Sequence, residues 1–335
     1  MKLFTLLVFF TLTLFGGTNL KIATYNVENL FDLQRSGHEY REFIPYTNAN
    51  WNKKTYKIKL QNLSRVIKDI DADILALQEI ESLQALKDLR FTLKQNGLYY
   101  PYFKIANKKS TTIKVALLSK VPFIVTQEVR VTSSYKYRNI LEAKFKVNNE
   151  IFTLFVNHWK SKSGPESMRI VSAKALRKRL DILGYNKNII LLGDFNADYE
   201  ENKKFLRKRK HNDTHGRTGI NDVLRTKELT QKVSNLSLTN DKNLYNLWYD
   251  TPKEKRYTYI FRGKKEAMDN IIISQSLLSK SGIFYKENSI HSFKPKYLFH
   301  KKSIYRWKMT WKKPRKHKGK GYSDHLAVIA EFLVL

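Results

Sequence analysis

Residues 188–198 read NIILLGDFNAD, an apolar run of four residues that ends in a glycine and a group of polar side chains. A continuous apolar run of this length is typical of a strand that is covered on both faces. Asp194 and Asn196 follow directly, where the strand should end. Ligands of α/β sheets bind beyond strand ends, where loops converge. The stretch therefore predicts a buried strand with functional groups at its end.

The same kind of apolar run recurs along the chain, with amphipathic segments between some of the runs. Apolar residues at 3–4–3 spacing predict helices over residues 60–70 and 173–183, the second of which should stop at Gly184. Two runs are joined directly by Asn148-Asn149, which predicts a β-hairpin. Some runs are thus connected through a helix and others directly through a turn. This combination favours a layered α/β fold with mixed sheets. The further runs are residues 22–25, 74–77, 115–118, 152–156, 271–273 and 326–330.

Polar side chains stand at the ends of these runs. If the runs that follow Asp269 and Asp324 are antiparallel to the others, all of these side chains meet at one rim of the molecule. A single loop carboxylate or histidine is usually structural, so the joint placement is what indicates an active site. The residues that follow a run are Asn26, Glu79, His158, Asp194 and Asn196, and those that precede one are Asp269, Asp324 and His325.

Six short motifs occur in order along the chain. They are TYNVEN (24–29), LQE (77–79), VNHWKSK (156–162), GDFNAD (193–198), MDNIIIS (268–274) and SDH (323–325). On these motifs the chain resembles the endonuclease/exonuclease/phosphatase superfamily from about Lys21 to its C-terminus. That resemblance implies a four-layer α/β sandwich, in which two mixed β-sheets pack face to face with helices outside.

The resemblance implies a metal site. Glu79 corresponds to the family's principal metal-binding carboxylate, Asn26 assists it, and Asp324 corresponds to a second carboxylate near the metal. Mg²⁺ suits a site with one or two carboxylates because it keeps several waters and also binds substrate phosphate. We expect Mg²⁺, with Mn²⁺ and Ca²⁺ as alternatives.

The resemblance also implies catalytic roles. Asp194 corresponds to the residue that orients or deprotonates the attacking water, and Asn196 to the amide that holds a phosphate oxygen. His325 corresponds to the imidazole at the scissile phosphate, with Asp269 as its carboxylate partner. His158 matches a histidine of deoxyribonuclease-like members that assists the leaving group. The sequence has no cysteine, no P-loop motif and no H-E-x-x-H, which disfavours thiol, P-loop and zincin chemistry.

The charge of the chain is strongly positive. Sixty-two Lys and Arg stand against thirty Asp and Glu, a formal net charge of +32, which favours a polyanionic partner. Two tracts are densest in cations, residues 203–210 and residues 286–320, and the second also contains Tyr297, Phe299, Tyr305, Trp307 and Trp311. Its aromatics either stack on bases or pack on the core. Candidate phosphate contacts, with a solvated surface as the equal alternative, are Arg138, Lys160, Lys162 and Arg169.

The first residues have the features of a secretory signal. Lys2 precedes an apolar run over residues 3–15, and Gly16, Gly17 and Thr18 supply small residues. We expect residues 1–20 to be a signal peptide, with cleavage between Gly16 and Leu20, and residues 21–335 to be the catalytic domain. The expected product is a secreted or periplasmic monomer without a stable membrane span.

These observations predict an exported, metal-dependent nuclease that hydrolyses phosphodiester bonds of DNA, with RNA as a further substrate. One alternative is a sphingomyelinase or phosphoinositide phosphatase, in which the same site acts on a lipid headgroup and an aromatic loop tip docks on the membrane. Another is a non-catalytic DNA-binding protein on a decayed nuclease fold, which the presence of every motif residue disfavours.

Overall fold

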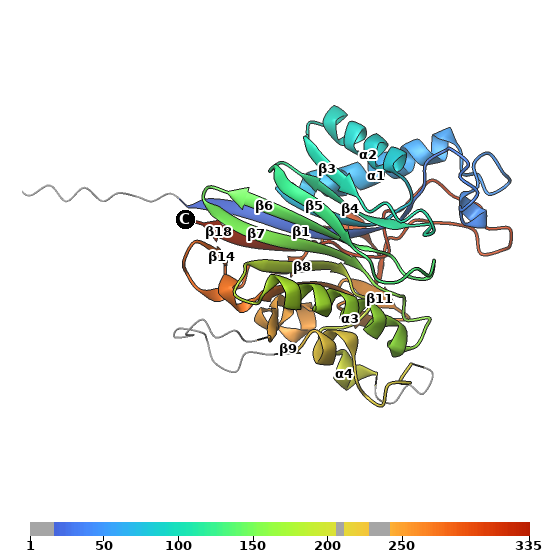
Figure 1. The fold of residues 1–335 in the computed structure, drawn as a ribbon. Helices are drawn as coiled ribbons and strands as arrows, with labels where there is room; N and C mark the ends of the chain where they lie inside the picture. The colour runs from blue at the N-terminus through green and yellow to red at the C-terminus, as the bar shows by residue number, and fades with distance from the viewer. Residues whose placement is uncertain (1–16, 206–210, 228–241) are drawn as a thin grey trace, which may run out of the picture.

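The computed structural model describes residues 17–205, 211–227 and 242–335. Within these ranges the strands form two seven-stranded sheets that pack face to face, with α1 and α2 on one side of the pair and α3 on the other (Figure 1). In spatial order, the first sheet contains β14 (Ile283–Tyr285), β18 (Val328–Val334), β1 (Thr18–Leu30), β2 (Ile74–Ile80), β4 (Lys114–Ser119) and β3 (Tyr102–Ile105), with β15 (His291–Ser292) also paired to β18.

In spatial order, the second sheet contains β5 (Phe123–Val129), β6 (Ile140–Val147), β7 (Glu150–His158), β8 (Ile189–Asp194), β13 (Asp269–Ser274), β10 (Leu244–Asn246) and β9 (Thr226–Lys227). It includes the strands labelled β5, β6, β7, β8 and β9 in Figure 1. Two small antiparallel pairs are β11 (Tyr259–Phe261) with β12 (Lys264–Glu266), and β16 (Phe299–His300) with β17 (Ser303–Ile304).

Both large sheets are mixed. The pairs β1–β2 and β7–β8 are parallel, whereas β18 is antiparallel to β1 and β13 is antiparallel to β8. The predicted hairpin across Asn148-Asn149 is formed by β6 and β7, with Val147 opposite Glu150. The predicted mixed sheets, and the reversed direction of the strands that follow Asp269 and Asp324, are therefore confirmed.

The helices begin and end where the sequence gives them caps. The side chain of Asn52 accepts two backbone N–H groups at the start of α1, and Gly184, with a φ of 83°, ends α3 as predicted. The helix α2 was not predicted, although Ser82 caps it. The helices are α1 (Lys53–Ile70), α2 (Leu83–Gln95), α3 (Glu166–Leu183) and α4 (Glu201–Lys204), and the shorter turns are η1 (Arg41–Phe43), η2 (Gly219–Val223), η3 (Leu247–Asp250), η4 (Lys253–Lys255), η5 (Gln275–Leu278) and η6 (Lys296–Leu298).

Three apolar cores separate the layers. In β8, Ile190 and Leu192 point into the core between the two sheets, whereas Ile189 and Leu191 point into the core beneath α3. On the opposite side, Ala23 of β1 lies in the core beneath α1 and α2. Alternation along the strands thus covers both faces of each sheet, which confirms the four-layer α/β sandwich.

The N-terminal segment joins the first sheet earlier than the signal prediction implied. Thr18 is the first residue of β1, and it pairs with Val334 of β18. Leu20 is 2% exposed and belongs to the core between the sheets. Residues 1–16 lie outside the described residues. Within the described part of the chain, no helix combines the length and hydropathy that a membrane crossing requires.

A buried lysine ties α1 to two of the motif segments. Lys59 is fully buried, and its Nζ donates to the carbonyl oxygens of Val27 at 2.8 Å, Glu28 at 3.0 Å and Tyr322 at 3.0 Å. Burial lowers the pKa of Lys59 to about 8, opposed by the carboxylates of Glu28 and Asp324. Lysine is rarely buried unless its ammonium group is paired. Lys59 therefore holds the end of β1 and the SDH segment against the same helix.

Replacing Lys59 with methionine keeps much of the side-chain volume but removes the donor for three carbonyl oxygens. We expect the free energy of unfolding to fall by about 2–4 kcal/mol, because each buried acceptor without a partner costs about 1–3 kcal/mol. Urea unfolding measures the change, and Lys57→Met on the exposed face of α1 is the matched control. If Lys59→Met were as stable as the wild type, this lysine would not anchor the two segments.

Candidate active site

Three candidate residues lie side by side at the end of the second sheet. His158 is opposite Asp194 in the β7–β8 pair, and Asp269 is opposite Asp194 in the β8–β13 pair. Gly193 precedes Asp194 with a φ of 132°, and a Cβ there would lie 2.1 Å from the carbonyl oxygen of Asn157. Only glycine permits this close approach of two strands. The backbone of the GDFNAD motif thus aligns the three side chains.

Polar contacts join this edge to the first sheet. The Asn26 Nδ2 of β1 donates to Asp194 Oδ2 at 3.0 Å, and His325, just before β18, lies with its Nδ1 2.7 Å from Asp269 Oδ2. The Ser323 hydroxyl donates to the carbonyl oxygen of Asn26 at 2.6 Å. The strand ends of both sheets therefore meet at one rim, as the sequence predicted for these residues.

Glu79 occupies a strained backbone position at the same rim. Its φ is 68°, and the β2–β4 pairing is irregular there. Asn196 also has a positive φ, 47°. Strained non-glycine residues persist where the surroundings hold them, and they concentrate at functional sites. The Glu79 carboxylate lies 3.8 Å from His158 Nε2, which in turn lies 3.5 Å from Asp194 Oδ2.

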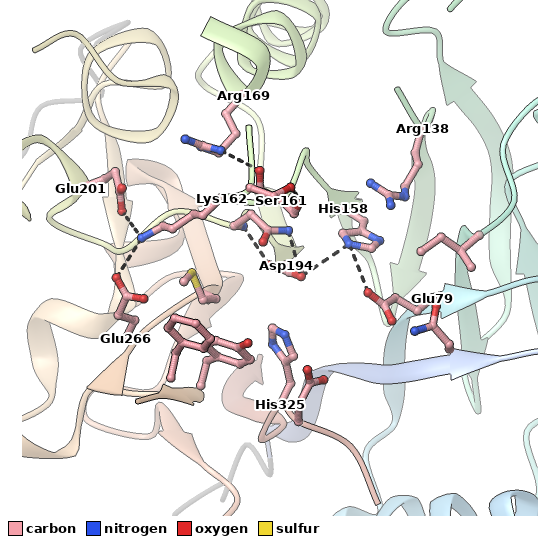
Figure 2. Close-up of a pocket in the computed structure, with 18 of the residues that line it drawn as sticks. Glu79, Arg138, His158, Ser161, Lys162, Arg169, Asp194, Glu201, Glu266 and His325 are labelled. Carbon is pink, nitrogen blue, oxygen red and sulfur yellow. Dashed lines mark hydrogen bonds and ion pairs between the residues drawn. The ribbon is translucent and has the colours of Figure 1, made fainter. Parts of the chain in front are cut away.

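These side chains surround a pocket of about 600 Å³ (Figure 2). Asn26 and Asp269 are each exposed by 1% or less. They lie behind the wall of the pocket, where Asn26 is bonded to Asp194 and Asp269 to His325. Lys160 is partly exposed and does not line this pocket. The predicted residues that line it are Glu79, Arg138, His158, Lys162, Arg169, Asp194, Asn196, Asp324 and His325.

The two histidines are held in opposite protonation states. Burial lowers the pKa of His158 well below its usual value, and the positive charge of Arg138 adds to this effect. Burial also acts to lower the pKa of His325, but the carboxylates of Asp269 and Asp194 outweigh it and hold that pKa well above the usual value. At neutral pH, His158 is therefore neutral and His325 is the cation.

Glu28 and Arg306 belong to the site and were not predicted. Glu28 is 5% exposed and accepts hydrogen bonds from Arg306 Nε at 2.8 Å and from the backbone N–H of Trp307 at 3.0 Å. Arg306 Nη2 also lies 3.2 Å from Asp324. Burial raises the pKa of Glu28 to about 8, as does Asp324, while Arg306 and Lys59 oppose the shift. Glu28 stands inside the TYNVEN motif, which was the one signal available in the sequence.

Carboxylate oxygens are concentrated at the rim, and two groupings offer ligands to a metal. Ligand atoms of Asp194, Asp269 and His325 lie within 4.8 Å of one another. In that grouping His325 Nδ1 is already hydrogen-bonded to Asp269, and the protonated imidazole cannot ligate a cation. Glu79 and Asp324 also offer carboxylate oxygens, and Asp324 Oδ2 is paired with Arg306 Nη2 at 3.2 Å. Burial raises the pKa of Glu79, and Asp324 contributes to the shift, so an added cation would relieve their repulsion.

The four predicted phosphate contacts fall into different surroundings. Arg138 lines the pocket, and its Nε is buried without a hydrogen-bond partner among the described residues. A buried donor of this kind is suited to an anionic ligand. Lys160 is partly exposed, and burial lowers its pKa, an effect to which the positive charge of Arg138 adds.

Lys162 and Arg169 require a revised interpretation. Lys162 Nζ lies between Glu201, at 2.7 Å, and Glu266, at 3.1 Å, so its charge is already neutralised (Figure 2). Arg169 is 1% exposed; it donates to Glu166 and to carbonyl oxygens of the loop that precedes α3. Both side chains shape the pocket by holding that loop, and neither presents a free cation to a phosphate.

The two basic tracts also differ from expectation. In the first, Lys203 and Lys204 pair with Glu200 and Asp198, and residues 206–210 lie outside the described residues. In the second, Tyr297, Phe299, Tyr305 and Trp307 pack against the core beneath α1 and α2. Trp311 is 93% exposed. The alternative with aromatics inward and charges outward therefore holds for all the tract's aromatics except Trp311.

Solved structures with the same fold have low sequence identity to this chain. D. rerio TDP2 complexed with single strand DNA product is 13% identical, with a TM-score of 0.58, and the match covers 94% of this chain and 99% of that one. An endonuclease/exonuclease/phosphatase family protein from Leptotrichia buccalis C-1013-b is 16% identical, with a TM-score of 0.55 and coverages of 93% and 98%. No curated protein matches the sequence.

The family comparison is more direct. The model of the endonuclease/exonuclease/phosphatase family matches residues 21–218 and 218–333, nearly the whole of the described chain. This match confirms the resemblance that the six motifs carried. Enzymes of the family hydrolyse phosphoester bonds, and the acidic and imidazole groups of the pocket are suited to that reaction. The chain belongs to the endonuclease/exonuclease/phosphatase family, whose enzymes are hydrolases that act on phosphoester bonds.

Proposed function

We propose that this protein is an exported, metal-dependent nuclease that hydrolyses phosphodiester bonds of DNA, with RNA as a further substrate. The observation that carries the proposal is the convergence in one pocket of Asp194, the Asp269–His325 pair and the unpaired donor of Arg138. A phosphodiester requires a group that activates water, a group that stabilises developing charge and cations that neutralise the phosphate. Each requirement has a candidate side chain here.

The donor set of the pocket fits a hard divalent cation. Glu79 and Asp324 would hold Mg²⁺, or Mn²⁺ or Ca²⁺ in its place, because these ions take carboxylate oxygens. Asn26 is buried against Asp194 and orients that carboxylate. When bound, the cation would neutralise the phosphate charge that otherwise repels a nucleophile.

The remaining chemistry is assigned to the protein's own residues. A water attacks the phosphorus and gives its proton to Asp194, whose pKa burial has raised toward a base that works near neutral pH. The bond from phosphorus to the leaving oxygen breaks, and that oxygen takes a proton from His325, whose Nε2 remains available because Nδ1 faces Asp269. The Asn196 amide is placed beside Asp194 to hold a phosphate oxygen.

The role of His158 differs from the one that the resemblance implied. A histidine with a lowered pKa is neutral and is therefore a poor donor of a proton to a leaving group. We assign it instead to filling the space between Asp194 and Glu79, whose oxygens lie 3.5 Å and 3.8 Å from its Nε2. The proton-donating role falls to His325.

A nucleic-acid substrate is supported by charge. A formal net charge of +32 attracts long polyanions. The structural relative TDP2 from D. rerio has been solved with a single-strand DNA product. The exposed Trp311 favours the alternative of a lipid phosphodiesterase, because an aromatic tip docks on membranes. Its neighbours Lys312, Lys313, Arg315 and Lys316 are all exposed cations, which suits a polyphosphate better.

We propose that the mature chain is secreted or periplasmic and is monomeric. The start of β1 bears on where the signal is cut. Cleavage after Leu20 would remove three residues of β1 and one side chain of the central core. Cleavage next to Gly16 or Gly17 leaves the strand whole. We therefore propose a mature N-terminus at Gly17 or Thr18, three to four residues earlier than the domain boundary expected at Lys21.

The first test of the function is metal-dependent cleavage. Mature protein should nick circular DNA with Mg²⁺ or Mn²⁺ and stop when a chelator is added. Glu79→Gln, Asp194→Asn and His325→Ala should each lower turnover by about 10²-fold or more, the scale of losing a catalytic acid, base or charge stabiliser. Gel electrophoresis of plasmid DNA measures the loss.

The matched control for these variants is Glu254→Gln, an exposed carboxylate outside the pocket. It should cleave as the wild type does, and circular dichroism should show every variant folded. Undiminished cleavage in excess chelator would contradict the metal site. Release of phosphocholine from sphingomyelin without any cleavage of nucleic acid would transfer the assignment to the lipid alternative.

The second test concerns the charge of His325. Its pKa lies above the usual value, so the imidazole keeps its proton as the pH rises through neutrality. Asp269→Asn keeps the shape but removes the carboxylate that raises the pKa most, so the depressing effect of burial should prevail. In metal-free protein, NMR should place the His325 titration at a lower pH in Asp269→Asn than in the wild type.

In the same variant, the alkaline limb of the activity profile should move to lower pH, because the cation is lost sooner as the pH rises. Glu254→Gln should leave the titration in place. An unchanged His325 titration in Asp269→Asn would mean that this carboxylate does not hold the proton.

A further inference from the structure

Residues 308–320 form a hairpin whose base is fixed to the core. Lys308 N–H donates to the Lys320 carbonyl oxygen at 2.9 Å, and Lys318 N–H donates back to the Lys308 carbonyl oxygen at 2.9 Å. Trp307, at 2% exposure, donates from Nε1 to His317 Nδ1 at 2.7 Å. The backbone N–H of His317 donates to the Ala49 carbonyl oxygen at 2.8 Å. The tip of the hairpin is therefore presented by a rigid support.

The tip carries an aromatic ring among cations. Trp311 is 93% exposed, although every other aromatic of the basic tract packs inward. An indole held in water by a fixed backbone has unused apolar area. Within the described part of the chain, no carboxylate forms an ion pair with the cations of residues 308–320, whereas Arg306 pairs with both Glu28 and Asp324.

A pocket of about 470 Å³ lies between the tip and the rest of the chain. Its lining combines cations with aromatic rings and includes no carboxylate. Four cations of that lining are unpaired among the described residues. A concave site of this composition fits an anion that carries a flat ring. The lining residues that matter for this are Tyr305, Lys308, Trp311, Arg315, Lys318 and Lys320.

This pocket lies next to the active site, separated from it by one ion pair. Arg306 lines it, and Arg306 Nη2 lies 3.2 Å from Asp324 Oδ2. Asp324 in turn lines the active-site pocket. A chain molecule that enters the active site would pass over this ion pair to reach the second pocket, and at this boundary Arg306 pairs with both Asp324 and Glu28.

We propose that this second pocket is a nucleotide subsite, in which Trp311 stacks on an unpaired base and the cations hold the flanking phosphates. The proposal rests on the proposed nuclease function and names its substrate as single-stranded nucleic acid, or a single-stranded end, several nucleotides long. An indole stacks on a base only when the base is not paired. A membrane-docking tip would gather several apolar side chains. Here the neighbours of Trp311 are Lys312, Lys313, Pro314, Arg315 and Lys316.

The test is the dependence of binding on length. Fluorescein-labelled oligothymidylates of two to twelve nucleotides are titrated with full-length mature protein in chelator, which prevents turnover. Wild-type affinity should rise with length until the subsite is filled. Trp311→Ala should bind the longer oligomers roughly 5- to 100-fold more weakly, the scale of losing one base–aromatic stack, and the dinucleotide equally well. Phe91→Ala, which removes a ring that is 61% exposed on α2, is the matched control and should change nothing.

The contribution of the cations in this pocket is measured separately, from the dependence of binding affinity on salt concentration. Lys318→Gln combined with Lys320→Gln should flatten the slope of log affinity against log salt by about 1.4, because each phosphate contact on a single strand contributes about 0.7. Trp311→Ala should weaken binding and leave that slope in place. Lys87→Gln combined with Lys94→Gln, two exposed lysines of α2, should leave both affinity and slope unchanged.

A small chromogenic diester, thymidine 5′-(p-nitrophenyl phosphate), separates this proposal from the proposed function. It reaches the active site but not the hairpin, so Mg²⁺-dependent hydrolysis by wild type and by Trp311→Ala at equal rates supports the subsite. If the wild type fails to hydrolyse any diester, the nuclease function fails, while Trp311-dependent binding of long oligomers still supports the subsite.

Three results would overturn the subsite. One is unchanged binding of long oligomers by Trp311→Ala. Another is an equal loss of small-diester hydrolysis in that variant, which would mean that the hairpin acts through the structure of the active site. The third is Trp311-dependent sedimentation with phosphatidylcholine–phosphatidylserine vesicles in the absence of Trp311-dependent oligomer binding, which would make the hairpin a membrane contact.

Discussion

The arrangement of this protein depends on polar contacts that cross from one sheet to the other at a single rim. Elsewhere the sheets meet through an apolar core, which offers a buried charge no partner. At the rim, Asn26 of the first sheet bonds Asp194 of the second, and His325 bonds Asp269. Each contact fixes a catalytic candidate by using a residue from the opposite sheet. The separation and register of the sheets therefore set the geometry of the site, and a shift of either sheet would break both contacts.

The crowding of carboxylates at this rim explains why the buried Lys59 and the partly exposed Arg306 and Arg138 lie nearby. Glu28, Glu79 and Asp194 all have raised pKa values because burial disfavours their charged forms. Lys59 and Arg306 offset part of that effect from behind the site. Arg138 faces the pocket with an unsatisfied donor. Lys59 and Arg306 thus stabilise the carboxylates of the folded protein, whereas Arg138 is suited to bind an anionic substrate. The divalent cation that we propose among the remaining carboxylates would complete the same balance.

Much of the fold and of the candidate site followed from local sequence, for a physical reason. The residues Asn26, Glu79, Asp194 and Asp269 stand next to apolar runs, and the end of a buried strand is where a polar side chain must emerge. Interactions between distant segments had no such signature. The lysine pattern of α1 gave no sign that Lys59 is buried, because its partners are carbonyl oxygens more than thirty and more than two hundred residues away. Likewise, the pairing of Lys162 with Glu201 and Glu266 is a property of the folded chain. The helix α2 could have been found, since Leu86, Leu89 and Leu93 repeat the helical spacing.

The basic composition gains a more specific meaning once the cations are sorted by their partners. Those nearest the catalytic groups are largely occupied, as Lys162, Arg169 and Arg306 show. The cations of the hairpin over residues 308–320 have no acidic partner among the described residues, and Trp311 stands among them. A net charge distributed evenly would raise the attraction for any polyanion without favouring one orientation. Free cations beside the site instead add to the attraction for a polyanion next to the catalytic groups. The same sorting explains why a large positive charge is compatible with a compact fold: near the buried carboxylates it is neutralised, and elsewhere it is in water.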